Sequence, residues 1–186
     1  MKKVLVILAN GCEELEAVTI IDLLRRADIN VTTASLNNDK TNLALTTSRG
    51  IVLLADTTLD EALKNHYDML VLPGGLPGAD YLDKDARVQQ LILTMNKNNS
   101  YLAAICAAPK VLASAGILDG KQATSYPGVL ESMNLENTQL LTDNVVVAEN
   151  IITSRGPATA MEFALELIEL LLDKNKRNEV ANALLV

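Results

Sequence analysis

The sequence predicts an α/β fold in which helices cover both faces of a doubly wound, mostly parallel sheet. Strand-like apolar runs alternate along the chain with segments of helical periodicity. The run Val4–Ala9 is apolar throughout, as expected for a strand that a parallel sheet buries on both faces. Short motifs with glycine or polar residues follow several predicted strands, and ligands of such sheets bind beyond the carboxyl ends of the strands.

The elements of the first half follow from hydrophobic spacing and turn residues. Val18, Ile21 and Leu24 fall on one face of the first predicted helix. Asp56 or Thr57 is expected near the cap of the second helix. The predicted elements up to residue 99 are the strands Val4–Ala9, Ile29–Leu36 and Asp68–Leu72, the short strand pair Leu43–Thr47 and Ile51–Ala55, the helices Glu14–Ala27, Asp56–Lys64 and Ala86–Lys97, and a loop with a helical turn at Leu76–Leu82.

The second half continues the same alternation. Pro157 is suited to the first turn of a helix and is expected to open the longest helix of the chain. The predicted elements after residue 100 are the strand Tyr101–Ile105, a helix that ends at Ala115–Gly116, strand character at Gln122–Tyr126, a hairpin-like pair Val145–Ala148 and Ile151–Ser154, the long helix from Pro157 to about Lys174, and a last helix at Asn178–Leu185.

Composition limits the classes of protein to which the chain can belong. Its 186 residues are expected to form one domain, 1–186, and 49% apolar residues indicate a globular protein. A net charge of −7 argues against nucleic-acid binding, and no apolar run approaches membrane-spanning length, so we expect a cytoplasmic protein. Two cysteines and one histidine are too few for a disulfide scaffold or a zinc cluster. No phosphate-binding glycine motif is present, so no cofactor is expected.

The stretch Tyr101–Pro109, Y-L-A-A-I-C-A-A-P, is similar to a nucleophile elbow, in which a strand turns sharply into a helix and exposes one side chain. Cys106 would be that side chain, and Ala104 and Ala108 are small enough for the turn. The start of the helix would favour a thiolate. The alternative is that Cys106 is an ordinary buried apolar residue, and this stretch alone favours neither.

Three motifs fall at strand ends that converge in this fold. Asn10–Glu16 follows the first strand, Pro73-Gly74-Gly75 follows the strand Asp68–Leu72, and Cys106 follows its own strand. A carboxylate of the first motif could therefore meet the thiol, and the glycine pair would leave backbone N–H groups free to bind developing negative charge. A carboxyl group and a thiol can share a hydrogen bond when one of them is protonated.

The motifs A-A-I-C-A-A-P, V-L-P-G-G, G-C-E-E-L-E-A-V and T-S-R-G-P together closely resemble the ThiJ/PfpI superfamily. They are most similar to the branch of the parkinsonism-associated protein and the bacterial YajL-type chaperones. The resemblance implies a flavodoxin-like fold of the class I glutamine amidotransferase type, and a homodimer. It also implies a nucleophilic Cys106, a protonated Glu16 hydrogen-bonded to the sulfur, and Gly75 and Ala107 as N–H donors to an oxyanion.

The chain departs from related enzymes in lacking a histidine near the thiol. Ala107 stands where the protease-like branch has its histidine, and Tyr126 stands where other members have one. His66 is the only histidine and is expected on the surface, which argues against an amidase or a peptidase. Glu16 is left as the principal proton-transfer group, with Tyr126 as a candidate hydrogen-bond donor.

The sequence also allows predictions for other charged side chains and for the second thiol. Arg26 and Arg49 align with family arginines near the cysteine and the dimer contact, where they could bind an anionic group. Glu13 and Glu14 are expected to be solvated charges at a helix start. Cys12 is expected to fill a loop, with a resolving role as the alternative, and Ser154–Pro157 is expected to shape a strand end.

Two classes of function remain open after these observations. The first is an enzyme, a glyoxalase or protein deglycase, that acts on reactive dicarbonyls or glycation adducts through Cys106 and Glu16. The second is a redox-sensing chaperone in which oxidation of Cys106 is the signal. Both depend on the same pair of residues, so the sequence does not separate them.

Overall fold

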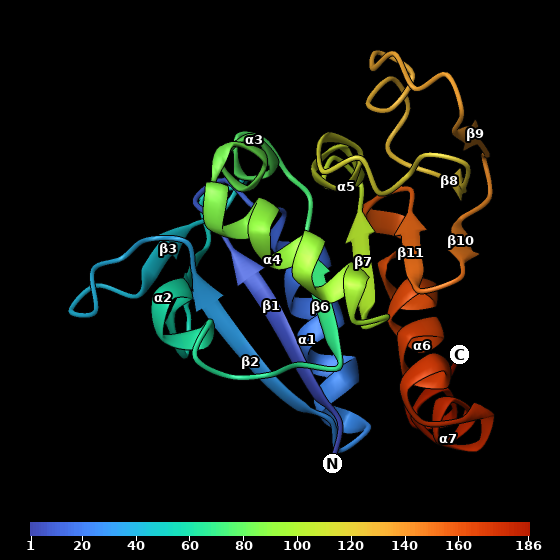
Figure 1. The fold of residues 1–186 in the computed structure, drawn as a ribbon. Coiled ribbons are helices and arrows are strands. Elements are labelled where there is room, and N and C mark those ends of the chain that lie inside the picture. Colours follow the sequence, from blue (N-terminus) through green and yellow to red (C-terminus); the bar gives the residue numbers. More distant parts are fainter.

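The computed structural model describes residues 1–186 and has a seven-stranded sheet at its centre (Figure 1). The strands lie in the order β10-β11-β7-β6-β1-β2-β5, and all neighbours are parallel except β10 and β11. This is the doubly wound, flavodoxin-like arrangement that was predicted. The strands are β1 (Lys3–Leu8), β2 (Asn30–Ser35), β5 (Thr57–Thr58), β6 (Met69–Leu72), β7 (Tyr101–Ile105), β10 (Val145–Ala148) and β11 (Ile151–Ser154).

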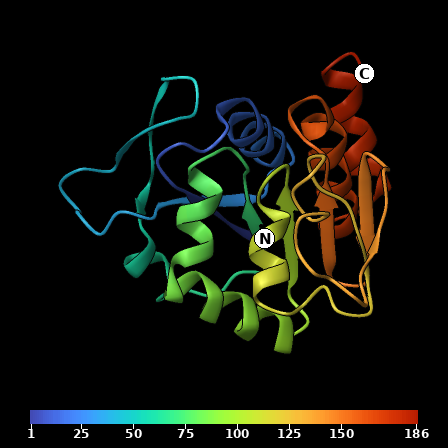
Figure 2. The same cartoon turned by 90° about the horizontal axis from the view of Figure 1, so that it is seen from above.

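Helices cover both faces of the sheet, as the view from above shows (Figure 2). One face carries α1 (Glu14–Arg26), α6 (Ala160–Leu171) and α7 (Lys174–Ala183), and the other carries α2 (Leu59–Ala62), α4 (Ala86–Lys97) and α5 (Pro109–Ser114). The helix α3 (Gly78–Lys84) follows β6 near the carboxyl edge of the sheet (Figure 1). None of these helices has the length and apolar character needed to cross a membrane.

The central strands explain why both faces need a cover. Successive side chains of a strand point to opposite faces. In β1, Val4 and Val6 belong to the core under α1 and α6, whereas Leu5 and Ile7 belong to the core under α4 and α5. The continuous apolar run of this strand therefore supplies two hydrophobic cores, one on each side of the sheet.

Two small strand pairs lie outside the main sheet. The predicted pair is present as antiparallel β3 (Ala44–Thr46) and β4 (Val52–Leu54). The strand expected at Gln122–Tyr126 is wrong in extent, because only β8 (Gln122–Ala123) is a strand, and it pairs with β9 (Gln139–Leu140). Beyond it the backbone N–H of Thr124 donates to the hydroxyl of Thr153 instead of to a neighbouring strand.

The helix predicted at Asp56–Lys64 is shorter than expected and begins later. Thr57 and Thr58 extend the sheet beside β2, and the Thr58 hydroxyl then caps α2 by accepting from Glu61 N. Asp56 does not cap this helix. Its carboxylate accepts hydrogen bonds from the backbone N–H and hydroxyl of Thr33, which ties this segment to β2.

Three further helix boundaries differ from the prediction. The loop expected at Leu76–Leu82 contains the helix α3. Pro157 opens a short 3₁₀ turn, Pro157–Thr159, before α6, and α6 has 12 residues against 13 in α1, so α6 is not the longest helix. The last helix begins at Lys174 instead of Asn178, because Asp173 leaves the helical conformation and its carboxylate accepts from Lys176 N.

Candidate active site

Cys106 lies at a sharp turn between β7 and α5 and has a left-handed backbone conformation. Its φ of 63° is rare for a residue with a side chain and must be held by surrounding contacts. The backbone N–H of Cys106 donates to the carbonyl of Ser154 at 2.9 Å, and its carbonyl accepts from the N–H of Tyr126 at 2.9 Å. Ala104 and Ala108 on either side are fully buried. The chain therefore has the elbow geometry that the sequence pattern indicates.

The loop after β6 passes very close to this turn, and only glycine allows it. A Cβ atom on Gly74 would lie 2.6 Å from Cys106 Cβ and 2.9 Å from Glu16 Oε2. Gly75 has a φ of 88°, and a Cβ there would lie 2.3 Å from Glu13 N. The glycine pair thus brings backbone N–H groups beside the thiol, where larger residues would separate the two loops.

Glu16, in the first turn of α1, points into the protein beneath the thiol. It is completely buried, and its Oε2 accepts a hydrogen bond from Gly74 N at 2.8 Å. Its Oε1 has no hydrogen-bond partner in the chain. Burial raises the pKa of Glu16 to about 7, although the N–H of Gly74 and the neighbouring thiol of Cys106 act in the opposite direction. Both protonation states of this carboxyl group are therefore accessible near neutral pH.

Cys106 and Glu16 form a coupled pair in which each affects the proton of the other. Burial, together with the charge of ionised Glu16, raises the pKa of Cys106 to about 12, while hydrogen bonding from the backbone N–H groups of Gly75 and Ala107 lowers it. The surroundings thus favour a thiolate less than the sequence suggested. A proton on Glu16 removes its negative charge and turns the carboxyl group into a donor, so the pair ionises together.

The turn between β3 and β4 closes the site from another side. The Ser48 backbone N–H donates to the carbonyl of Cys12, and the Ser48 hydroxyl lies 2.6 Å from Glu13 Oε2 and 2.9 Å from Glu14 Oε2. The Arg49 N–H donates to Glu14 at 3.0 Å. The expectation that Glu14 is solvated is wrong, since its side chain is buried. Burial acts to raise the pKa of Glu14, but hydrogen bonds from its own backbone N–H, Ser48 and Arg49 together lower it below its usual value.

These elements surround a cavity of about 380 Å³ that reaches the thiol, the thiol cavity. It brings together five of the predicted site residues, Cys106, Gly75, Ala107, Arg49 and Tyr126, and Glu16 lies buried beneath it. The side chain of Tyr126 is half exposed, and its hydroxyl has no hydrogen bond to the site. The cavity is lined by Glu13, Ser48, Arg49, Gly75, Leu76, Cys106, Ala107, Tyr126, Val129 and Pro157.

Three other predicted residues lie outside the thiol cavity. Arg26 is at the far end of α1, about 15 Å along the helix from Glu16, and it pairs with Asp22 at 2.7 Å. It therefore does not belong to the site of its own chain, and its place at a dimer contact stays a prediction. Cys12 is fully buried, and burial raises its pKa to about 12, which agrees with a filling role. His66 is exposed, as expected.

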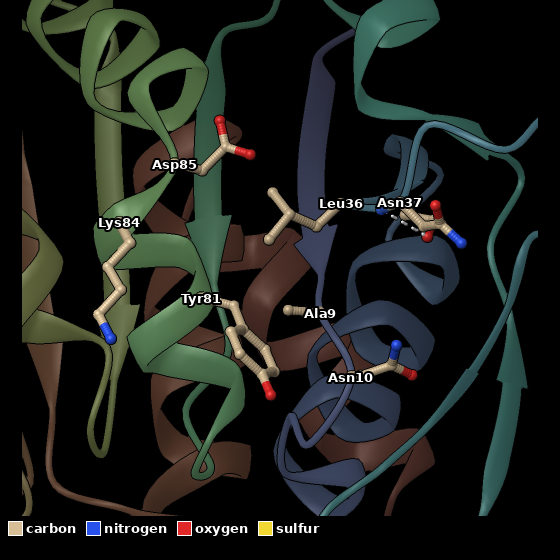
Figure 3. Close-up of a pocket in the computed structure, with 8 residues that line it drawn as sticks. Ala9, Asn10, Leu36, Asn37, Tyr81, Lys84 and Asp85 are labelled. Atoms are coloured by element: carbon tan, nitrogen blue, oxygen red, sulfur yellow. Dashed lines mark hydrogen bonds between the residues drawn. The ribbon is translucent and has the colours of Figure 1, made fainter.

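A separate cavity of about 350 Å³ lies at the carboxyl ends of β1 and β2 (Figure 3). Ala9, Leu36 and Tyr81 face one another in it, whereas the ammonium group of Lys84 points away (Figure 3). It contains neither cysteine nor Glu16, so it is not part of the thiol site. No group of three or more His, Cys, Asp or Glu side chains is placed to hold a metal ion.

Sequence reasoning missed the contributions of Ser48, Leu76 and Val129 to the thiol cavity. Ser48 is adjacent to Arg49 in the predicted turn, so its position was a usable signal once that turn was placed at the site. Val129 follows a strand that was predicted too long, and Leu76 was assigned to a loop without a role. Neither has a motif of its own, and only the tertiary arrangement brings them to the thiol.

Comparison with known proteins agrees with this geometry. The model of the DJ-1/PfpI family matches residues 2–170. Protein dj-1beta of Drosophila melanogaster is 44% identical over 186 residues, which cover 100% of this chain and 97% of that protein. Its crystal structure has a TM-score of 0.93 to this chain and covers 100% and 98% of the two chains.

Two further relatives extend the comparison. A Caenorhabditis elegans protein named glutathione-independent glyoxalase DJR-1.2 is 32% identical over 172 residues, which cover 92% of this chain and 89% of that protein. Protein DJ-1 homolog B of Arabidopsis thaliana is 41% identical, but this chain spans only 41% of its length.

Proposed function

The chain belongs to the DJ-1/PfpI family, and we propose that it is a cysteine-dependent stress-protection protein that acts on reactive dicarbonyls or their glycation adducts. The observation that carries the proposal is the pairing of a thiol that lines a cavity with a fully buried acid. Cys106 is held at the floor of an open cavity, and Glu16 beneath it has a pKa of about 7. The name of the Caenorhabditis elegans relative supports a glyoxalase-type reaction.

The reaction we propose begins with addition of the Cys106 sulfur to the aldehyde carbon of a 2-oxoaldehyde. The thiol proton passes to the carbonyl oxygen, and the resulting hemithioacetal oxygen rests against the N–H groups of Gly75 and Ala107. Glu16 then removes the proton from that carbon, which gives an enediolate. The hemithioacetal hydroxyl passes its proton to the neighbouring oxygen, and Glu16 returns the first proton to the neighbouring carbon, which gives the thioester of a 2-hydroxy acid. Water hydrolyses the thioester, releases the 2-hydroxy acid and restores the thiol.

Turnover of methylglyoxal by the purified protein, in buffer free of metal ions and Tris, tests this proposal. Cys106→Ser should abolish lactate formation, and Glu16→Gln should lower kcat by about 10²–10⁴-fold, the usual contribution of a general acid–base group. Cys12→Ala is the matched control, because Cys12 lies outside the thiol cavity, and it should retain activity. Wild-type turnover by Glu16→Gln would show that Glu16 is not the proton-transfer group.

A redox-sensing chaperone is the second candidate, and one observation favours it. The Cys106 thiol opens into a cavity, whereas Cys12 has no exposed surface, so an oxidant has access to only one of the two thiols. Under this function, oxidised protein should suppress aggregation of a denatured client, and Cys106→Ser should not acquire that activity. If wild type lacks methylglyoxal turnover but its oxidation confers this suppression, the sensor function replaces the enzymatic one.

A further inference from the structure

A second cavity, of about 360 Å³, adjoins the thiol cavity. The two share Leu76, Ala107 and Val129 in their linings, so they lie next to each other, and we call the pair the cleft. Ala107 is also one of the backbone donors that act on the sulfur. We call the second cavity the side chamber, and its remaining lining residues are Asp80, Asp83, Lys110, Gly128, Ser132 and Met133.

One side of the side chamber offers apolar surface. Leu76, Val129 and Met133 contribute aliphatic side chains to it. The one cationic group in its lining, Lys110, pairs with Asp80, and Asp83 adds a second carboxylate that has no cationic partner. The lining therefore disfavours an anionic substituent, whereas its aliphatic side chains can cover a neutral hydrocarbon group.

The size of the cleft exceeds what the smallest dicarbonyls require. Cavities of about 300–1,000 Å³ hold ligands of drug size. The thiol cavity alone, at about 380 Å³, falls in that range, and methylglyoxal places only a methyl group beyond its two carbonyl carbons. The side chamber would stay empty with such a substrate, although it begins at Ala107, directly after the reactive residue.

We propose that the side chamber is a subsite for the substituent of the carbonyl substrate, and that the preferred substrates carry an alkyl or aryl group larger than methyl. This inference rests on the proposed reaction at Cys106 and specifies its substrate class. The reacting carbon sits at the sulfur, the oxyanion faces Gly75 and Ala107, and the substituent passes between Leu76 and Val129 into the side chamber.

Alkylation of Cys106 tests the subsite without requiring turnover. The rate constants for iodoacetamide and N-benzyl iodoacetamide are measured by mass spectrometry, with peptide mapping to confirm the modified cysteine. The two reagents carry the same reactive group, so their ratio reports binding of the benzyl group. We expect the rate constant of wild type to be about tenfold higher for the benzyl reagent, because partial burial of a ring stabilises its complex by about that factor.

Substitutions at Ser132 test whether the benzyl preference arises in the side chamber or elsewhere in the site. Ser132 is exposed and its hydroxyl donates to the carbonyl of Val129, so Ser132→Phe should fill the chamber and remove the benzyl preference, while Ser132→Ala should keep it. Ala158→Phe changes an exposed residue next to Pro157 that lines neither the thiol cavity nor the side chamber; it introduces the same ring and should also keep the preference. No benzyl preference in wild type, or an equal loss in Ala158→Phe, would overturn the proposal.

A turnover series completes the test and distinguishes the two proposals. Wild type should convert 2-oxohexanal with a higher kcat/KM than methylglyoxal, and Ser132→Phe should lose about tenfold or more on 2-oxohexanal only. Equal losses on both aldehydes would overturn the subsite. If neither aldehyde is converted but the alkylation preference follows the Ser132 variants as expected, the subsite stands and the proposed enzymatic function fails.

Discussion

Glu16 is a carboxyl group that the fold buries completely and supplies with one backbone donor. Its position relative to Cys106 was implied by the family motif, but its environment was not, because burial depends on how α1, β6 and β7 meet. The same is true of Glu14. From the sequence, Glu14 was expected to be a solvated charge at a helix start. It can be buried because the turn at Ser48, 34 residues away, supplies hydrogen bonds to its carboxylate.

The raised pKa of Glu16 predicts a pH-dependent stability. Because the folded protein holds this proton more tightly than the unfolded chain, the stability that Glu16 contributes is full below about pH 4.5 and is lost as the pH rises through about 7. Relative to Glu16→Gln, wild type should lose on the order of 2–3 kcal/mol of unfolding free energy over that interval. Urea unfolding of both proteins at several pH values measures it. A constant difference between them would show that folding does not shift this pKa.

The two thiols should differ in their response to oxidants. Both have a raised pKa, so access and neighbours decide the outcome. Cys106 opens into the thiol cavity, and N–H groups of Gly75 and Ala107 are placed to bind added oxygens, whereas Cys12 is enclosed. Mild peroxide should therefore convert Cys106 to the sulfinic acid and leave Cys12 reduced. Intact mass and peptide mapping check this, and earlier oxidation of Cys12 would contradict it.

Among the elements, those with long apolar or periodic patterns were predictable and those made by distant contacts were not. The observed bounds of β1, β7 and α4 lie within a residue or so of the predicted ones. In these elements the apolar residues follow one another, or recur at helical spacing, within a single segment of the sequence. The two-residue strands β5, β8 and β9 exist only because a partner strand lies beside them. No local pattern of two residues identifies such a strand.

The start of α7 was also not predicted from the sequence, and its cap can be tested. Asp173 caps α7, whose Val180 is buried in the core on the α1 face. Asp173→Ala should lower the free energy of unfolding by about 1 kcal/mol, the usual cost of losing a cap. Turnover should not change, because α7 lies at the opposite end of the sheet from the thiol (Figure 1).

Denaturant unfolding measures the effect, with Asn175→Ala as the control. Asn175 is an exposed residue in the first turn of the same helix and does not cap it, so its substitution should be nearly neutral. Equal stability of the Asp173 and Asn175 variants would show that this cap does not hold the last helix in place.

At the scale of the whole molecule, one face leaves apolar side chains in solvent. Leu15 and Val18 of α1 lie on this face, and Val52 and Leu54 of the adjacent β4 are more than 60% exposed. Val18 and Leu54 line one groove between the helix and the strand. Several large apolar side chains exposed on one face are typical of a protein–protein interface. It includes the helix of Arg26 and adjoins the turn of Arg49, where the family resemblance places the dimer contact.

We therefore expect a twofold symmetric homodimer that covers the face formed by α1 and β4. Light scattering at micromolar concentration should give about 40 kDa, twice the 20.0 kDa of one chain. Leu54→Lys should give the single-chain mass, because a symmetric contact would place the two lysine charges opposite each other. Leu54 is exposed in the single chain, so the folded monomer should tolerate the substitution. Leu185→Lys, at an exposed residue near the C-terminus, should stay dimeric. A single-chain mass for wild type would exclude the dimer, and a dimeric Leu54→Lys would place the contact on another face.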